Sequence, residues 1–283
     1  MNNRIVVGVT GRPSAESAVD WALDYAEAHH TDVEFVHVVD DRWAILTKSL
    51  SGTALLEAEH ELRARAERAS ESHPSLSIHP TVVEGAPVDA LVEHATGARL
   101  LVVGSHELGR FRGAVFSTKA AHVAALATVD VAVVPAGRAL EGTGVVVGVD
   151  GSSSAVAALA FGAREADRRG EPVRAVYAWR ALSPWTTAHE EIQDLDPTDS
   201  DRLVLSEAVA GLAEEYPDLD LQLDLSRALP VDAILNAAIG ARLVVVGTHG
   251  RHGVAKVWLG SVSHEIVLAM PCPVVVVKPS SLG

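Results

Sequence analysis

Short runs of apolar, mostly β-branched residues alternate along the chain with longer stretches in which apolar positions recur every three or four residues. This alternation is typical of parallel sheets whose strands are joined by crossover helices. The runs that predict strands are 5–9, 33–38, 76–83, 100–103 and 131–134 in the first half, and 145–149, 173–178, 219–225, 243–246 and 274–277 in the second. We therefore expect an α/β fold with five strands in each half.

The stretches between these runs predict helices. Residues 14–29 and 153–169 each place small apolar side chains on one face, as a helix that covers a sheet requires. Pro87 and Pro230 each begin a helical stretch, where the missing N–H of proline has no cost. Both halves therefore follow the same order of elements.

The chain is an internal duplication. Gly8 and Gly148 are 140 residues apart, and Gly104 and Gly247 are 143 residues apart, about half of the 283 residues. We expect two tandem doubly wound domains, residues 1–138 and 143–283, each a five-stranded parallel sheet flanked by helices. Hydrophobic residues make up 48% of the chain and aromatic residues 4%, so the cores must consist mainly of Val, Leu, Ile and Ala.

Charge and hydropathy exclude several classes of partner. The net charge of −14 would repel a phosphate backbone, so we do not expect nucleic-acid binding. No apolar run approaches the roughly 18 residues that cross a bilayer, and the N-terminus shows no signal-peptide pattern, so we expect no membrane association and a cytoplasmic location. Cys272 is the single cysteine, which excludes an internal disulfide and favours a buried structural thiol.

The most informative segment is 247–261, GTHGRHGVAKVWLGS. Its Gly-x2-Gly-x9-Gly-Ser spacing follows an apolar strand and precedes a helical stretch. Glycines let backbone N–H groups approach an anion closely, and a helix N-terminus favours negative charge. The segment therefore predicts a phosphate-binding loop. Ser261 and Ser263 can donate to phosphate and cap the helix at the same time, and Ser261 can also reach a bridging metal. Arg251 either contacts phosphate or is simply exposed.

Asp150 follows the first strand of the second half, in VVVGVDGSSSA. If that strand lies beside the one that ends at Gly247, both meet where ligands bind in open α/β sheets, and Asp150 accepts hydrogen bonds from a ribose. The alternative is a simple turn with a helix cap. His249 and His252 lie in a glycine-rich loop that does not fix them as a metal pair. The Gly-Lys-Ser/Thr ending of a P-loop is missing, so we expect binding rather than catalysis and assign no catalytic residue.

These residues resemble the universal stress protein family in its tandem form. Its adenine-nucleotide-binding members carry an aspartate after the first strand and a Gly-x2-Gly-x9-Gly-Ser/Thr loop after the fourth, which Asp150, Gly247, Gly250, Gly260 and Ser261 match. The resemblance implies a Rossmann-like fold of the HUP type, recognition of adenine by the main chain near Ala178, and pairing of the final strands of two domains across a dimer or pseudo-dimer axis. The nucleotide-binding residues that we predict are Gly148, Asp150, Ala178, Gly247, Thr248, His249, Gly250, Arg251, Gly253, Gly260, Ser261, Val262 and Ser263.

The first domain departs from this pattern. Without gaps, Thr10 stands in the place of Asp150, Glu107 in that of Gly250, and Ser117 in that of Gly260. Thr118 for Ser261 is the one conservative change. Glu107 would bring a carboxylate to the place of the phosphates, so we expect a degenerate nucleotide motif in the first domain.

The resulting hypothesis is an ATP-binding or adenine-nucleotide-binding universal stress protein that acts as a nucleotide-dependent stress regulator or sensor. Any metal would be Mg2+ that the nucleotide brings. A homo-oligomer and a protein partner fit this role. Two alternatives stay open: a slow ATPase or nucleotidyl-transferring enzyme, and a partner-binding protein whose site is vestigial in both halves.

Overall fold

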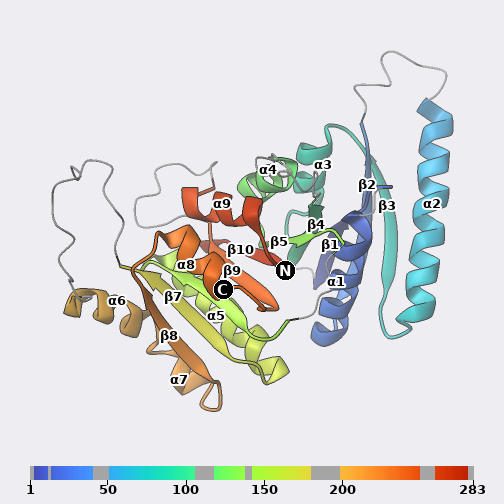
Figure 1. Cartoon of the computed structure of the whole chain (residues 1–283). Coiled ribbons are helices and arrows are strands. Elements are labelled where there is room, and N and C mark those ends of the chain that lie inside the picture. The colour runs from blue at the N-terminus through green and yellow to red at the C-terminus, as the bar shows by residue number, and fades with distance from the viewer. Residues whose placement is uncertain are drawn as a thin grey trace, which may run out of the picture. The chain divides into compact units, whose positions relative to one another are not determined.

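The computed structural model describes residues 3–11, 14–40, 51–105, 118–137, 142–179, 198–248 and 259–279. The chain divides into two compact units, Met1–Leu140 and Glu141–Gly283. In Figure 1 the first unit runs from blue to green and the second from yellow-green to red. Within the described residues, each unit has five parallel strands with helices on both faces of the sheet, which confirms the expected fold class.

The first unit has the strand order β3-β2-β1-β4-β5. Its strands are β1 (Arg4–Gly8), β2 (Asp32–Val39), β3 (Ile78–Glu84), β4 (Leu100–Ser105) and β5 (Val131–Pro135), and its helices are α1 (Ser14–His29), α2 (Ser51–Ser72), α3 (Pro87–His94) and α4 (Thr118–Leu126). Because parallel crossovers are right-handed, α1 and α2 cover one face of the sheet, and α3 and α4 lie against each other on the opposite face (Figure 1).

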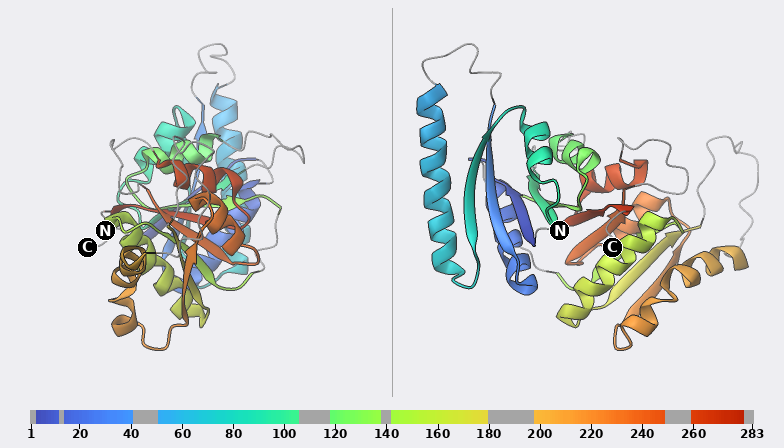
Figure 2. Two further views of the ribbon diagram at one scale, coloured as in Figure 1. Left: turned by 60° about the vertical axis from the view of Figure 1, so that its left-hand side comes forward. Right: turned by 180° about the vertical axis from the view of Figure 1, so that it is seen from behind.

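The second unit repeats this plan with the order β10-β9-β6-β7-β8. Its strands are β6 (Val145–Val149), β7 (Val173–Ala178), β8 (Leu221–Ser226), β9 (Leu243–Gly247) and β10 (Val274–Val277), and its helices are α5 (Ser153–Arg169), α6 (Asp199–Val209), α7 (Leu212–Glu215), α8 (Pro230–Ala237) and α9 (Ser261–Ala269). The helix α5 packs mainly against β6 and β9, and Figure 2 shows this yellow-green helix from two sides. In this unit, α8 and α9 lie together on the face that corresponds to that of α3 and α4.

The predicted strands and helices agree closely with those observed. The two third strands begin two residues later than predicted, at Ile78 and Leu221. The difference has a local cause, because the N–H groups of Leu76 and Leu219 donate to the carbonyls of His73 and Tyr216 in the preceding turns. Local turn hydrogen bonds therefore use backbone donors that a longer strand would need.

The cores are aliphatic, as the composition predicts. Ile5, Val6 and Val7 of β1 are fully buried, and so is Val147 of β6. Cys272 is free and buried. Within the parts of the chain that the structure describes, no helix combines the length and the apolar character that a membrane span needs.

Charged side chains stabilise the edge of each sheet where the strands begin. In the first unit, Glu34 of β2 pairs with Arg4 of β1 and accepts hydrogen bonds from Thr81 at 2.7 Å and His94 at 2.9 Å. Burial alone would raise the pKa of Glu34, but the hydrogen bonds and the positive neighbours outweigh it and lower the pKa.

The second unit has its own network at the same edge. Glu171 accepts the N–H of Gly144 and the Nε–H of Arg242, both at 2.7 Å. These polar networks therefore belong to the scaffold, and they leave the opposite edge, where the strands end, for ligands.

Candidate functional site

The strands that carry Asp150 and Gly247 are neighbours. Val145, Val146 and Val147 of β6 pair in parallel with Leu243, Val244 and Val245 of β9. The chain runs outward from β6 through β7 to β8, and then returns to β9 on the other side of β6. Strand order therefore reverses between β6 and β9, which is where ligands bind in doubly wound sheets. The condition for the two strand ends to meet, that β6 and β9 are neighbours, is therefore fulfilled.

Asp150 forms the turn that leads from β6 into α5. Its Oδ1 accepts the N–H of Ser152 at 2.9 Å, and the hydroxyl of Ser152 caps α5 by accepting the N–H of Ala155 at 3.2 Å. This is the turn-and-cap role that the sequence allowed. Since an ionised carboxylate has about four acceptor positions, the turn is compatible with further hydrogen bonds from a ligand. Asp150 is half-buried, so it is positioned by the fold and also reachable.

Gly247 lies at a point of very close packing. A Cβ atom at Gly247 would stand 2.6 Å from the Oγ and 2.8 Å from the carbonyl carbon of Ser154, the second residue of α5. Real Cβ atoms essentially never show such distances to backbone. Glycine is therefore required here for the first turn of α5 to approach the end of β9.

Hydrogen bonds hold the two ends of the predicted loop together. The carbonyl of Thr248 accepts the N–H of Gly260 at 2.8 Å, and the Thr248 hydroxyl donates to the carbonyl of Val277 at 2.8 Å. The Ser263 hydroxyl donates to the carbonyl of Gly247 at 2.6 Å. Ser263 and Thr248 are both buried, so these contacts assign them a positioning role at the base of the loop.

The helix α9 begins without a side-chain cap. Gly260 is its N-cap residue, with φ −57° and ψ 152°, and within the described part of the chain no side-chain cap of the first turn occurs. Ser261, the first residue of α9, is exposed, and Val262 is half-buried. The capping role that we considered for Ser261 and Ser263 is therefore not the one that this structure shows. An uncapped N-terminus leaves backbone N–H donors for an anion.

Gly148 and Ala178 flank the same edge of the sheet. A Cβ atom at Gly148 would come within 2.7 Å of the Cδ1 of Ile234, so this glycine lets α8 pack closely on β6. Ala178 ends β7, the neighbour of β6 on the other side, and it is half-buried. The remaining predicted residues, His249, Gly250, Arg251 and Gly253, lie outside the described residues.

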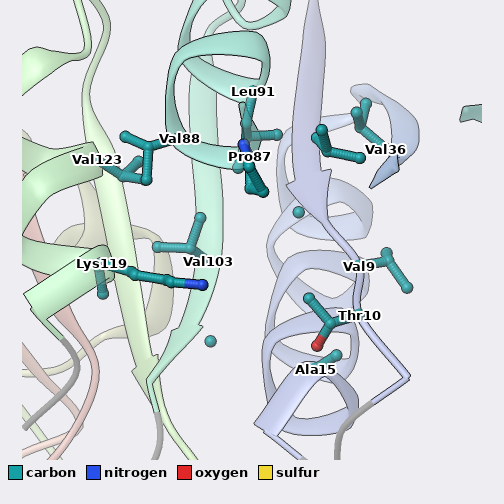
Figure 3. A pocket seen from close by; sticks show the side chains of 14 residues that line it. Val9, Thr10, Ala15, Val36, Pro87, Val88, Leu91, Val103, Lys119 and Val123 are labelled. Carbon is teal, nitrogen blue, oxygen red and sulfur yellow. The ribbon is translucent and has the colours of Figure 1, made fainter. Parts of the chain in front are cut away.

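The first unit has a pocket at its own corresponding edge. Thr10 lies there after β1, and Gly104 lies near the end of β4, so the strand ends are arranged as in the second unit. Lys119, in the first turn of α4, also lines this pocket and extends toward it (Figure 3). The sequence reasoning overlooked Lys119. The 143-residue offset between the two halves indicates its position, because Lys119 corresponds to Val262, which is one of the predicted nucleotide-binding residues of the second unit.

No cluster of three or more metal-ligating side chains occurs among the described residues of either unit. The second unit offers a carboxylate at Asp150, backbone donors and the N-terminus of α9. This set suits an anionic ligand that also carries hydroxyl groups.

Fold and strand-end geometry together define a tandem pair of doubly wound α/β domains. The family model "Universal stress protein family" matches residues 1–135 and again 143–278, and the chain therefore belongs to this family.

Universal stress proteins of mycobacteria are similar to this chain over nearly its whole length. The chain is 28% identical to universal stress protein Rv2005c of Mycobacterium tuberculosis, covering 98% of this chain and 97% of the relative. It is 27% identical to a universal stress protein of Mycolicibacterium smegmatis, with 97% of both chains covered. Among solved structures, a universal stress protein of Archaeoglobus fulgidus has the same fold, with a TM-score of 0.72, 17% identity, and coverage of 98% of this chain and 99% of that chain.

Proposed function

We propose that the second unit binds an adenine nucleotide, ATP in the first place, and that the protein acts as a nucleotide-dependent regulator or sensor in a stress response. One observation carries the proposal: Asp150, Gly247 and the uncapped start of α9 belong to one sheet edge, at the point where strand order reverses. Membership of the universal stress protein family agrees with this role.

Each part of the site has a defined task in this proposal. Asp150 accepts hydrogen bonds from the ribose hydroxyls while it keeps its turn to Ser152. The backbone N–H groups at the start of α9 bind phosphate oxygens, assisted by the helix dipole, and Ser261 donates from its exposed hydroxyl. The main chain at Ala178 contacts the adenine from the end of β7. Any Mg2+ arrives with the nucleotide.

The proposal assigns binding to the second unit alone. In the first unit, Thr10 replaces the carboxylate of Asp150, and the sequence places Glu107 where Gly250 stands. A regulator of this kind acts through a protein partner or through assembly with further copies, and we place its action in the cytoplasm. These points follow from the proposed role.

The sharpest test of the ribose contact is a pair of substitutions at Asp150. Asp150→Asn keeps an acceptor oxygen for the Ser152 N–H but removes the charge, whereas Asp150→Ala removes both. A hydrogen bond to a charged group contributes about 1.5–3 kcal/mol. We therefore expect Asp150→Ala to weaken ATP binding roughly 10- to 100-fold in calorimetric titration, with Asp150→Asn in between.

The matched control is Thr10→Ala at the corresponding place of the first unit, which should leave ATP affinity unchanged. Circular dichroism checks that every variant keeps its fold. If Asp150→Ala binds ATP as the wild type does, or if Thr10→Ala weakens ATP binding instead, the assignment of the ribose contact to the second unit is wrong.

A further inference from the structure

A pocket of about 250 Å3 opens where the strands of the first unit end (Figure 3). Its walls come from the strands β1, β2 and β4 and from the helices α3 and α4. The floor is tightly packed, since a Cβ atom at Gly8 would come within 2.9 Å of the Cδ2 of Leu91. The volume lies below the roughly 300–1,000 Å3 of most small-molecule sites, which limits the ligand to a small one.

The walls of this pocket are aliphatic. Val36 and Val38 come from β2, Leu91 from α3, Val103 from β4 and Val123 from α4. The described walls contain no aromatic ring, so they favour an apolar ligand body and offer no stacking partner to a base.

One charge and one hydroxyl break this apolar surface. In Figure 3 the Lys119 side chain extends from α4 across the end of β4, and Thr10 lies beyond it at the end of β1. Among the described lining residues there is no aspartate or glutamate; Glu107, which follows β4 in the sequence, lies outside the described residues. Lys119 is exposed, so water solvates its ammonium group until a ligand arrives. The described lining of the pocket therefore has a net positive charge and a nearby hydroxyl donor.

The charged positions of this pocket differ from those of the second unit: an acidic residue is replaced by a neutral one, and a neutral residue by a basic one. With the offsets of the duplication, Thr10 replaces Asp150 and Lys119 replaces Val262. The first change removes the acceptor for sugar hydroxyls, and the second adds a cation. Val38 in place of Ala178 adds two methyl groups beside the end of β2. Together these changes disfavour a nucleotide and favour an apolar anion.

We propose that this pocket binds a small aliphatic monocarboxylate. Its carboxylate pairs with the Lys119 ammonium and accepts the Thr10 hydroxyl, and its chain lies against Val36, Leu91 and Val103. A phosphate monoester carries close to two negative charges at neutral pH, whereas the one cation of the described lining matches the single charge of a carboxylate. The proposal is independent of nucleotide binding by the second unit.

The test is a calorimetric titration of the full chain with octanoate. Octanol, which has the same chain length but no charge, is the neutral control ligand. We expect one octanoate site per chain. Lys119→Gln should weaken octanoate binding at least about tenfold, because it removes a charge-assisted hydrogen bond, and Lys119→Arg should restore most of it. Octanol binding should not respond to Lys119→Gln. Thr10→Asp should also weaken octanoate binding, since it returns a carboxylate to the pocket.

Octanoate should bind equally well in the presence of saturating ATP. Absence of saturable octanoate binding would overturn the proposal, and so would equal affinity in the folded Lys119→Gln variant. Displacement of octanoate by ATP or AMP at one-to-one stoichiometry would show instead that the pocket takes a nucleotide. Circular dichroism of each variant separates loss of the site from loss of the fold.

Discussion

Gly247→Ala is expected to destabilise the second unit by about 1–3 kcal/mol and to weaken ATP binding at least about tenfold. The added Cβ would lie 2.8 Å from the backbone of Ser154, so either the start of α5 or the end of β9 must shift. That shift displaces Asp150, which precedes α5, and also the carbonyl of Gly247, which accepts the hydrogen bond from the Ser263 hydroxyl. Thermal unfolding and ATP titration measure the two effects.

Gly211→Ala is the matched control for this substitution. Gly211 belongs to the same unit, has φ −74°, and has open space around its Cβ position. Its replacement should change stability by no more than about 0.5 kcal/mol and leave ATP binding intact. Equal stability of Gly247→Ala and Gly211→Ala would contradict the close approach of α5 to β9.

Gly250→Glu, which copies Glu107 of the first domain into the second, is expected to abolish ATP binding without unfolding the protein. A carboxylate within about 4 Å of a phosphate charge costs about 1 kcal/mol in water and about 4 kcal/mol near a protein surface. The latter is a loss of affinity of roughly a thousandfold. Calorimetric titration measures this loss.

Gly250→Ala separates charge from backbone effects, because it adds a side chain without a charge. We expect it to retain measurable binding that is weaker than that of the wild type. Unchanged ATP affinity in a folded Gly250→Glu protein would refute the phosphate-binding role of the loop.

The fold followed from the sequence because each local signal agreed with the global plan. Valine-rich runs became the buried strands β6 and β9, and Pro87 and Pro230 begin α3 and α8 as predicted. The predicted starts of β3 and β8 were two residues too early, at 76 and 219. The hydrogen bonds of the turns after α2 and α7 set the observed starts at Ile78 and Leu221, and the hydrophobic pattern does not reveal such hydrogen bonds.

The candidate site was only partly predictable. Spacing alone indicated the strand ends at Asp150 and Gly247, and β6 and β9 are indeed neighbours. Spacing could not reveal that Ser263 donates to the carbonyl of Gly247 or that Gly148 makes room for Ile234, because both depend on packing between segments distant in sequence. The glycine motif does not predict Lys119, because Lys119 corresponds to Val262, which is not one of the motif residues.

The central claim is that the chain has one adenine-nucleotide site, in its second unit. Calorimetric titration of the full chain with ATP in the presence of Mg2+ tests it most directly. The account predicts saturable binding with a stoichiometry near one per chain. A stoichiometry of two would show that the first unit tolerates Thr10 and Glu107, and a titration without saturable binding would show that the second-unit site does not take ATP.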